Sequence, residues 1–99
     1  MQSGKATDKH KQLSAFFKAL AHPARLAIIE MLLCNKACTC NGFVIKLPFA
    51  QANIPGHLRQ LKQEGFVSVS EKGSSSEYRV NKQVFRQFMQ MQMEMKIFE

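Results

Sequence analysis

The sequence predicts an α+β fold that is mainly α-helical and carries one β-hairpin. Two observations lead to this prediction. Apolar residues recur at three- and four-residue spacing along most of the chain, which is typical of helices packed against a core. In contrast, the segment FVSVS at residues 66–70 alternates apolar and polar side chains, as a half-buried strand does. With 99 residues, of which 45% are hydrophobic, the chain is long enough for a single domain, 1–99, but not for two.

The first two helices are predicted from their caps and their apolar faces. Residues 1–7 are expected to be frayed, and Thr7 or Asp8 is expected to cap a helix that runs to about Leu20. Pro23 suits the first position of a second helix, which ends near Cys34. The expected buried faces hold Leu13, Phe16, Phe17 and Leu20 in the first helix, and Leu26, Ile29 and Leu33 in the second, with Ile28 and Leu32 beside them.

A later helix contains a conflict between its apolar spacing and its residue types. It ends at Glu64, and Gly65 follows as the residue that terminates it. Pro55 and Gly56 lie within its buried stripe, although a proline inside a helix costs about 3 kcal/mol and a glycine about 1 kcal/mol. We therefore predict that this helix begins late, with Asn53 as its N-cap, or is kinked near residues 51–55.

The remaining elements complete a recognisable order. The polar break CNKACTCNG precedes a short helix, which is predicted from Gly42 or Phe43 to Lys46. Residues 66–70 and 76–80 are the predicted hairpin, and a last helix covers about residues 82–97. Helices followed by a hairpin and a final helix are the order of a winged helix-turn-helix, in which the hairpin is the wing.

The charge and the cysteine content limit the classes of partner and of chemistry that the protein is expected to have. Lys and Arg number 14 against 7 acidic residues, so the favoured partner is an anion, with nucleic acid first and an anionic membrane second. No apolar run approaches the roughly 20 residues of a membrane span, and no signal peptide is visible, so a cytoplasmic protein is expected. Three cysteines in such a chain favour metal or redox chemistry over a disulfide. No catalytic triad, carboxylate pair or phosphate-binding loop is visible, which argues against an enzyme.

Three segments of the sequence together resemble one known family. FKALAHPARLAIIEMLL, then CTC, then LPFAQANIPGHLRQLKQEGFVSVSEKGSSSEYRV follow one another over about residues 13–81. In this order they resemble the ArsR/SmtB family of metal-responsive repressors. The resemblance implies a homodimer joined by the first and last helices. It also implies binding to double-stranded operator DNA without inducer, and release from it when the inducer binds.

The helix that ends at Glu64 would then be the recognition helix, whose N-terminal end enters the major groove. Two amide side chains near that end can each pair with adenine, and the cations farther along can meet bases or phosphates. The alternative is an ordinary solvated helix face. The expected DNA-binding residues are Gln51, Asn53, His57, Arg59, Lys62 and, at the wing tip, Lys72, with Arg79 as a further candidate.

Cys34, Cys38 and Cys40 form the candidate metal site, because sulfur ligands favour soft ions. Lys36 lies among them, and its charge favours the thiolate forms. Cys38 and Cys40 match the Cys-x-Cys of the family's arsenic sensors, which makes arsenite or antimonite the first choice of inducer; no permanent cofactor is expected. Cys34 matches no fixed family position, so it is either a third ligand or a buried small hydrophobe. Cd²⁺, Pb²⁺ and Zn²⁺ stay open.

The expected function is a repressor that a thiophilic ion releases from DNA. Drawing the sulfurs together would move the segment ahead of the helix-turn-helix, and two recognition helices would lose their spacing of roughly 34 Å. Two other functions stay open, a thiol redox regulator on the same fold and a protein–protein module with weakened DNA binding. The last helix lacks His, Asp and Cys, so the family's zinc site is not expected there, and its alternating Met89, Met91, Met93 and Met95 are expected at a dimer interface rather than at a copper site.

Overall fold

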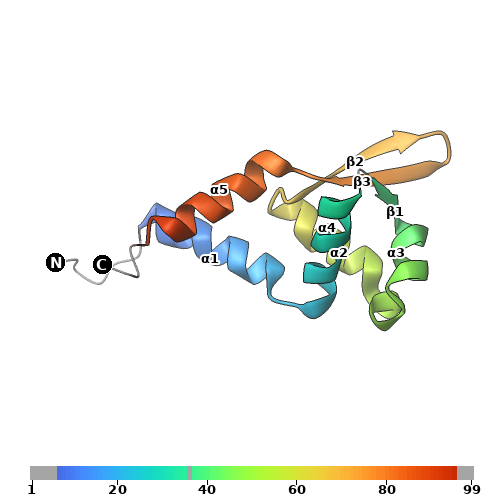
Figure 1. Cartoon of the computed structure of the whole chain (residues 1–99), viewed down its shortest axis with the longest axis horizontal. Helices are drawn as coiled ribbons and strands as arrows, with labels where there is room; N and C mark the ends of the chain where they lie inside the picture. Colours follow the sequence, from blue (N-terminus) through green and yellow to red (C-terminus); the bar gives the residue numbers. More distant parts are fainter. Residues whose placement is uncertain (1–6, 36, 96–99) are drawn as a thin grey trace.

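The computed structural model describes residues 7–35 and 37–95 of the chain (Figure 1). It confirms the predicted fold class, a mainly helical chain with the element order of a winged helix-turn-helix. The last helix was predicted to end at about residue 97, but it ends at Met93, with Glu94 as its C-cap. In chain order the elements are α1 (Asp8–Leu20), α2 (Pro23–Cys34), β1 (Cys38–Thr39), α3 (Cys40–Lys46), the 3-10 helix η1 (Pro48–Asn53), α4 (Ile54–Gln63), β2 (Val67–Lys72), β3 (Ser75–Val80) and α5 (Lys82–Met93).

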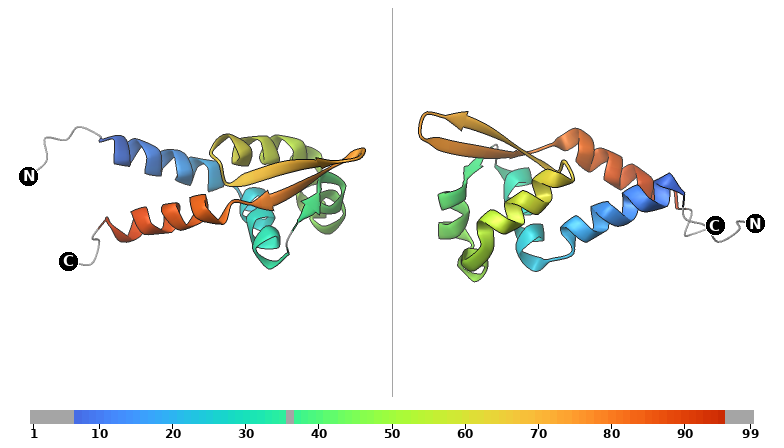
Figure 2. Two further views of the ribbon diagram at one scale, coloured as in Figure 1. Left: turned by 90° about the horizontal axis from the view of Figure 1, so that it is seen from above. Right: turned by 180° about the vertical axis from the view of Figure 1, so that it is seen from behind.

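The elements divide between two ends of the molecule. α1 and α5 lie side by side at one end, whereas the helix-turn-helix and the hairpin occupy the other (Figure 1 and Figure 2). β2 and β3 extend beyond the helices as a two-stranded wing. The recognition helix α4 contacts α1, α2 and α3, so its position is fixed from several sides. Within residues 7–35 and 37–95, no helix has the length and apolar character needed to cross a membrane.

Both N-terminal helices begin where the sequence predicts. The Thr7 hydroxyl accepts a hydrogen bond from the backbone N–H of His10 at 3.2 Å, and the Thr7 N–H donates to His10 Nδ1 at 3.1 Å. Thr7 is therefore the cap of α1 and not part of a frayed stretch; residues 1–6 lie outside the described part of the chain. At α2, Pro23 is the first helical residue, and His22 Nδ1 accepts from the Ala24 N–H at 3.0 Å.

The recognition helix begins late, as predicted. Residues Pro48–Asn53 form η1, and α4 starts at Ile54 with Asn53 as its N-cap. Pro55 is then the second residue of α4, where its missing N–H removes no helical hydrogen bond. After the helix ends, Gly65 adopts a φ of 84°, the left-handed conformation that favours glycine. The conflict around Pro55 is thus resolved by a change of helix type ahead of it.

The sheet has three strands among the described residues, whereas the sequence predicted two. β3 pairs antiparallel with β2 along the whole wing, and its other edge pairs with β1. In this second pairing Cys38 lies opposite Tyr78, and Thr39 lies opposite Glu77. β1 is two residues long, too short to show any periodicity, so sequence reasoning did not find it. The strand order β1-β3-β2 joins the cysteine-rich segment directly to the wing.

The core corrects the predicted face of α2. Leu26 and Leu33 are predicted to be buried, but their side chains are 54% and 45% exposed. α2 is apolar nearly all round, so spacing alone does not select its inner face; its packing against α4 and β3 does. Phe17, also predicted to lie on a buried face, is 45% exposed. The buried core residues are Leu13, Phe16, Ala19, Leu20, Ala24, Ile28, Ile29, Leu32, Phe43, Leu47, Ile54, Leu58, Leu61, Phe66, Val67, Phe88 and Met91.

An aromatic cluster joins α1, α5 and the base of the wing. Phe66, which directly precedes β2, is fully buried. Its ring centroid lies 5.2 Å from that of Phe16 in α1 and 5.6 Å from that of Phe88 in α5. Aromatic pairs at these separations add to the stabilisation from burial. This cluster connects the helix-turn-helix to the pair of terminal helices.

Candidate nucleic-acid interface and cysteine segment

The recognition helix α4 has one buried and one exposed face. The buried face holds Ile54, Leu58 and Leu61, none of which is more than 1% exposed. Arg59 and Lys62 lie on the exposed face. Both cations therefore face solvent, where contact with a base edge or a phosphate is sterically open to them.

The other expected DNA-binding residues lie at the two ends of this surface. Asn53 is exposed at the N-terminal end of α4, while Gln51 lies in η1 and its side chain is outside the described residues. Lys72 ends β2, and its Nζ atom lies 3.8 Å from Glu77 Oε1. Arg79 Nη2 approaches the same oxygen at 3.6 Å. Exposed ion pairs contribute little to stability, so exchanging this carboxylate for a phosphate costs little.

His57 departs from its expected role, because its side chain is buried and only 5% exposed. It is three residues after Ile54 and four before Leu61, so it shares their inner face. Arg25 Nε donates a hydrogen bond to His57 Nδ1 at 3.2 Å, and the His22 ring lies 4.3 Å away, centroid to centroid. Burial, together with the nearby His22 and Arg25, lowers the pKa of His57 below its ordinary value of 6.5. His57 is thus a neutral residue that positions α4 rather than a DNA-facing cation.

Arg25 connects three helices through this contact. Besides its bond to His57 in α4, its guanidinium donates to the backbone carbonyls of Lys18 at 3.4 Å and Ala19 at 3.3 Å, near the end of α1. Both carbonyls belong to the last turn of α1, which continues no farther to supply helical partners, although Lys18 O also accepts from the Ala21 N–H at 3.3 Å. A single side chain at the start of α2 therefore fixes the end of α1 against the recognition helix.

The segment with two cysteines connects α3 to the wing. Thr39, between Cys38 and Cys40, caps α3: its hydroxyl accepts a hydrogen bond from the Gly42 N–H at 3.0 Å. The Cys38 side chain lies over this first turn, since a Cβ atom added at Gly42 would be 2.7 Å from Cys38 Sγ. Burial raises the pKa of the Cys38 thiol, and the charge of Lys46 only partly offsets it. Lys36, which was expected to act on the thiols, lies outside the described residues.

The three sulfurs do not converge in the described structure. Cys34 ends α2 and is exposed, whereas Cys38 and Cys40 are half-buried against the core. Among residues 7–35 and 37–95, no three His, Cys, Asp or Glu side chains lie close enough to hold a metal ion. The alternative that Cys34 is a buried hydrophobe is wrong for this chain, because Cys34 is exposed. The sulfur chemistry fits a soft ion, but three-sulfur ligation requires the segment to rearrange or a ligand to come from elsewhere.

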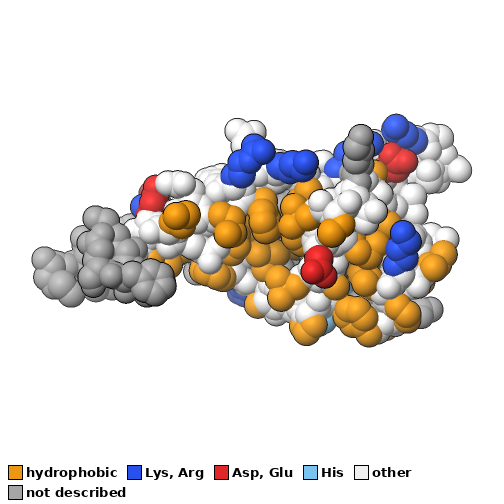
Figure 3. Space-filling model, in the orientation of Figure 1, with side chains coloured by type: hydrophobic (Ala, Val, Ile, Leu, Met, Phe, Trp, Pro, Cys, Tyr) orange, Lys and Arg blue, Asp and Glu red, His pale blue; other side chains and the backbone are white. Residues whose placement is uncertain are grey.

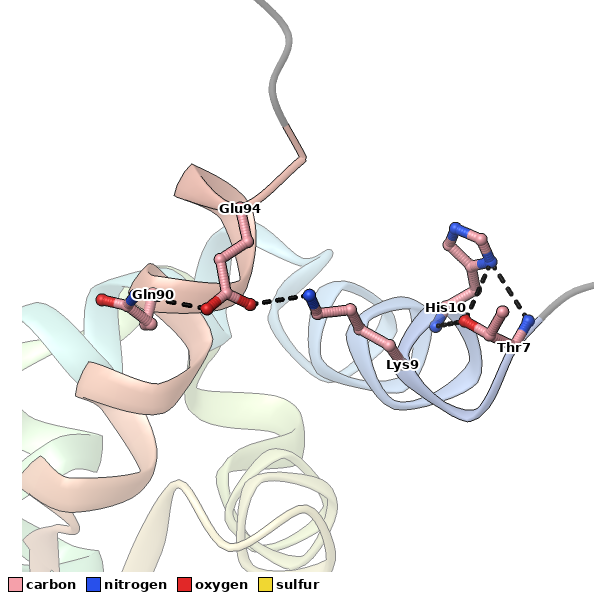
Figure 4. Close-up of polar contacts among 5 residues, drawn as sticks. All are labelled: Thr7, Lys9, His10, Gln90 and Glu94. Carbon is pink, nitrogen blue, oxygen red and sulfur yellow. Dashed lines mark hydrogen bonds and ion pairs between the residues drawn. The ribbon is translucent and has the colours of Figure 1, made fainter. Parts of the chain in front are cut away.

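The paired helices α1 and α5 carry an exposed apolar surface. Its members are Phe17, Met89, Met93 and Met95, which are between 45% and 78% exposed. Hydrophobic side chains also spread over much of the face shown in Figure 3. At the far end of the pair, Lys9 Nζ lies 2.7 Å from Glu94 Oε1, and Gln90 Nε2 donates to Glu94 Oε2 at 3.3 Å (Figure 4). The hydrogen bond from Lys9 is the main reason that the pKa of Glu94 is lowered.

Individual known proteins are similar to this chain, although no family model matches it. An ArsR-like transcriptional regulator from Rhodococcus sp. RHA1 superposes with a TM-score of 0.77 at 20% identity, over 90% of this chain and 83% of that one. An arsenical resistance operon repressor of Staphylococcus xylosus is 29% identical over 72 residues, which cover 73% of this chain and 68% of that protein. An uncharacterized helix-turn-helix-type transcriptional regulator of Methanocaldococcus jannaschii is 32% identical over 72 residues, covering 72% of this chain and 80% of the relative. The chain belongs to the helix-turn-helix-type transcriptional regulators. Within them it is similar to ArsR-like regulators.

As an ArsR/SmtB-like chain it is a transcriptional regulator and not an enzyme. Two residues that position its functional elements escaped the sequence reasoning. Thr39 was detectable as a Thr three residues before Gly42 and just ahead of an apolar run, which is the pattern of a helix N-cap. Arg25 had no such signal, because its partner His57 is 32 residues away along the chain.

Proposed function

We propose that this ArsR/SmtB-like regulator is a single-domain, homodimeric repressor that binds operator DNA and is released by arsenite or antimonite. Cys38 and Cys40 would hold the ion, with Cys34 as the candidate third ligand. The observation that carries the proposal is the place of Thr39, which lies between two thiols, caps α3 and pairs with the wing strand β3. An ion bound there acts on the helix-turn-helix and on the wing at once.

DNA binding is supported by the exposed face of α4 and by the wing. Arg59 and Lys62 lie on α4, Lys72 lies near the tip of the wing, and the chain has a net charge of +7. A basic winged helix of this kind contacts phosphates with its cations, and each such contact steepens the salt dependence of binding by about one logarithmic unit. His57 is not among the residues proposed to contact DNA, because its side chain is buried.

A homodimer is supported by the apolar surface of α1 and α5. Phe17, Met89 and Met93 are 45%, 48% and 78% exposed in one chain, and a second copy packed on the same helices would bury them. A two-fold dimer also presents two recognition helices to successive major grooves, roughly 34 Å apart. Sedimentation equilibrium of the wild type and of Met93→Glu tests this interface, because a dimer through α5 dissociates when a charge is placed there.

Arsenite is favoured over other soft ions by two facts. The Staphylococcus xylosus relative is named a repressor of an arsenical resistance operon. In addition, Cys38 and Cys40 offer two free sulfur ligands in this segment. Thiolate ligands suit a thiophilic ion. An ion releases the repressor when it binds the arrangement that cannot bind DNA more tightly than the arrangement that can. The ratio of these two affinities sets how far DNA binding is weakened.

The test measures binding to duplex DNA from the region upstream of the protein's own gene, with and without arsenite, cadmium and peroxide. Arsenite should weaken binding by the wild type about tenfold or more, and the double variant Cys38→Ser, Cys40→Ser should keep its DNA. Cys34→Ser is the matched control, since it removes an exposed thiol without touching Thr39. If it also abolishes release, Cys34 is the third ligand. Circular dichroism verifies that each variant is folded.

Three outcomes would contradict parts of this proposal. Release of the double variant by arsenite would exclude Cys38 and Cys40 as the sensor. Release of the wild type by peroxide alone, reversed by a reductant, would favour a thiol redox regulator. Failure to bind any duplex at low salt would favour a protein–protein module on this fold.

A further inference from the structure

The first turn of the recognition helix contains a glycine that the backbone does not require. Gly56 is the third residue of α4, and positive φ values among the described glycines occur only at Gly65 and Gly73. A glycine in a helix is less stable than an alanine because its backbone loses more freedom on folding. Gly56 therefore lowers the stability of α4 without relieving any backbone strain.

The space beside Gly56 is filled by another side chain. A Cβ atom added to Gly56 would clash with Oδ1 of Asn53 and would lie 2.9 Å from both its Cγ and its Nδ2 atoms. The carboxamide of Asn53 thus occupies the volume that a side chain at position 56 would take. Although Asn53 is the N-cap of α4, its side chain makes no capping hydrogen bond, so its amide is not used to satisfy the helix end.

Residues 53–56 offer few ways to read a base. Ile54 is fully buried, Pro55 has an apolar ring, and Gly56 has no side chain. Asn53 is exposed and carries the one side-chain amide of these four residues. An asparagine can accept from and donate to an adenine edge at once, in the major groove, and the N-terminal end of a recognition helix is the part that approaches base edges.

We propose that Gly56 is a specificity-determining residue, because it leaves the space in which the Asn53 carboxamide lies across the first turn of α4 to read an adenine. The inference rests on the proposed DNA binding and assigns different roles to two residues of the first turn of α4. The carboxamide that contacts the base belongs to the N-cap residue Asn53. Gly56 has no side chain that would occupy the same space. An alanine at position 56 stabilises the helix but displaces the Asn53 carboxamide.

The experiment is a double-mutant cycle on the full-length protein, with Gly56→Ala, Asn53→Ala, the double variant and the wild type. Affinity is measured by fluorescence anisotropy, at one fixed salt concentration, for the bound upstream duplex, for versions with single A·T pairs exchanged, and for an unrelated duplex. Thermal unfolding is followed for the same proteins. Gln63→Ala, an exposed substitution at the other end of α4, is the matched control.

Gly56→Ala should raise the melting temperature and weaken binding to the upstream duplex about tenfold, the loss expected for one amide–adenine contact. Binding to the unrelated duplex should not change. In the Asn53→Ala background, Gly56→Ala should still raise the melting temperature but should have no further effect on affinity. In the free protein, the side-chain NH₂ resonances of Asn53 should shift in Gly56→Ala and not in Gln63→Ala.

Two results would overturn the inference while leaving DNA binding intact. Wild-type affinity in Gly56→Ala would show that the empty position is not needed. A tenfold loss that persists without the Asn53 amide would show that the added methyl group meets the DNA itself. If the wild-type protein binds no duplex specifically, the proposed function and this inference fall together; the Asn53 resonances then report only the packing of the free chain.

Discussion

The recognition helix and the cysteine segment lie next to each other but are held in different ways. α4 is anchored by three side chains that are at most 1% exposed and by the bond between Arg25 and buried His57. The segment around Cys38 and Cys40 is half-buried and consists of a two-residue strand with one side-chain cap at Thr39. Segments with few buried contacts open at low free-energy cost. The comparison shows that α4 is fixed to the core by fully buried side chains, whereas Cys38 and Cys40 lie in a short segment that is only half-buried.

The largest expected effect comes from breaking the aromatic cluster that joins the helix-turn-helix to α1 and α5. Phe66→Ala removes a fully buried ring that contacts Phe16 and Phe88, so the free energy of unfolding should fall by about 3–5 kcal/mol. Phe49→Ala is the matched control, because Phe49 is 66% exposed and its loss leaves no cavity. Urea denaturation measures both. Equal losses in the two variants would mean that the aromatic cluster around Phe66 contributes no more to stability than an exposed phenylalanine does.

A smaller effect should appear as a dependence of stability on pH. The folded chain keeps His57 neutral, while the unfolded chain takes up a proton near pH 6.5. The free energy of unfolding should therefore decrease as the pH falls below about 6.5, and His57 should add no slope above it, with a limit of about 1.4 kcal/mol per pH unit for one proton. Urea titrations at several pH values give the slope.

Two variants test whether His57 causes this dependence of the free energy of unfolding on pH. His57→Phe should flatten it, whatever its effect on stability at neutral pH. Phe49→Ala should leave it unchanged, because this variant removes an exposed side chain and no titratable group. A slope that survives in His57→Phe would assign the protonation to another group and would remove His57 from the anchor of α4.

The smallest effect should come from the cysteine segment. Thr39→Ala removes the cap of α3 and should cost about 1 kcal/mol. Thr7→Ala removes the corresponding cap of α1 at similar cost, but far from the helix-turn-helix. Fluorescence anisotropy should show weaker DNA binding without any ion for Thr39→Ala alone. Identical DNA affinities for the two variants would separate the cap of α3 from the DNA-binding surface.

Local chemistry explains which parts of the fold were predictable from the sequence. Thr7 caps the first helix and Pro23 starts the second through its own backbone preference, so those starts were found. The late start of α4 followed from the same reasoning about Pro55. The inner face of α2 was not predictable, because the helix is apolar nearly all round and its neighbours α4 and β3 decide which side is buried.

The candidate site was less predictable because its contacts join distant parts of the chain. The burial of His57 depends on Arg25, and the strand at Cys38 exists only because Tyr78 lies opposite it. The short spacing of the three cysteines along the chain also does not mean that their sulfurs lie together. Cys34, Cys38 and Cys40 lie within seven residues of one another, yet the end of α2 and the strand β1 separate Cys34 from the other two.

The pairing of β1 with the central strand β3 has a mechanical consequence. Tyr78 and Glu77, which pair with β1, lie at the middle of β3, and the wing continues outward to Ser75 and Lys72 as a hydrogen-bonded ladder. Strands advance about 3.3 Å per residue, so a six-residue hairpin behaves as a stiff arm of about 20 Å, and tilting it by about 10° carries its tip by about 3.5 Å. That displacement exceeds the length of a hydrogen bond. The same tilt moves Tyr78, two residues from the base of the arm, by about 1 Å. An adjustment of about 1 Å beside Cys38 thus moves the tip, where Lys72 is proposed to contact a phosphate, by more than the length of a hydrogen bond.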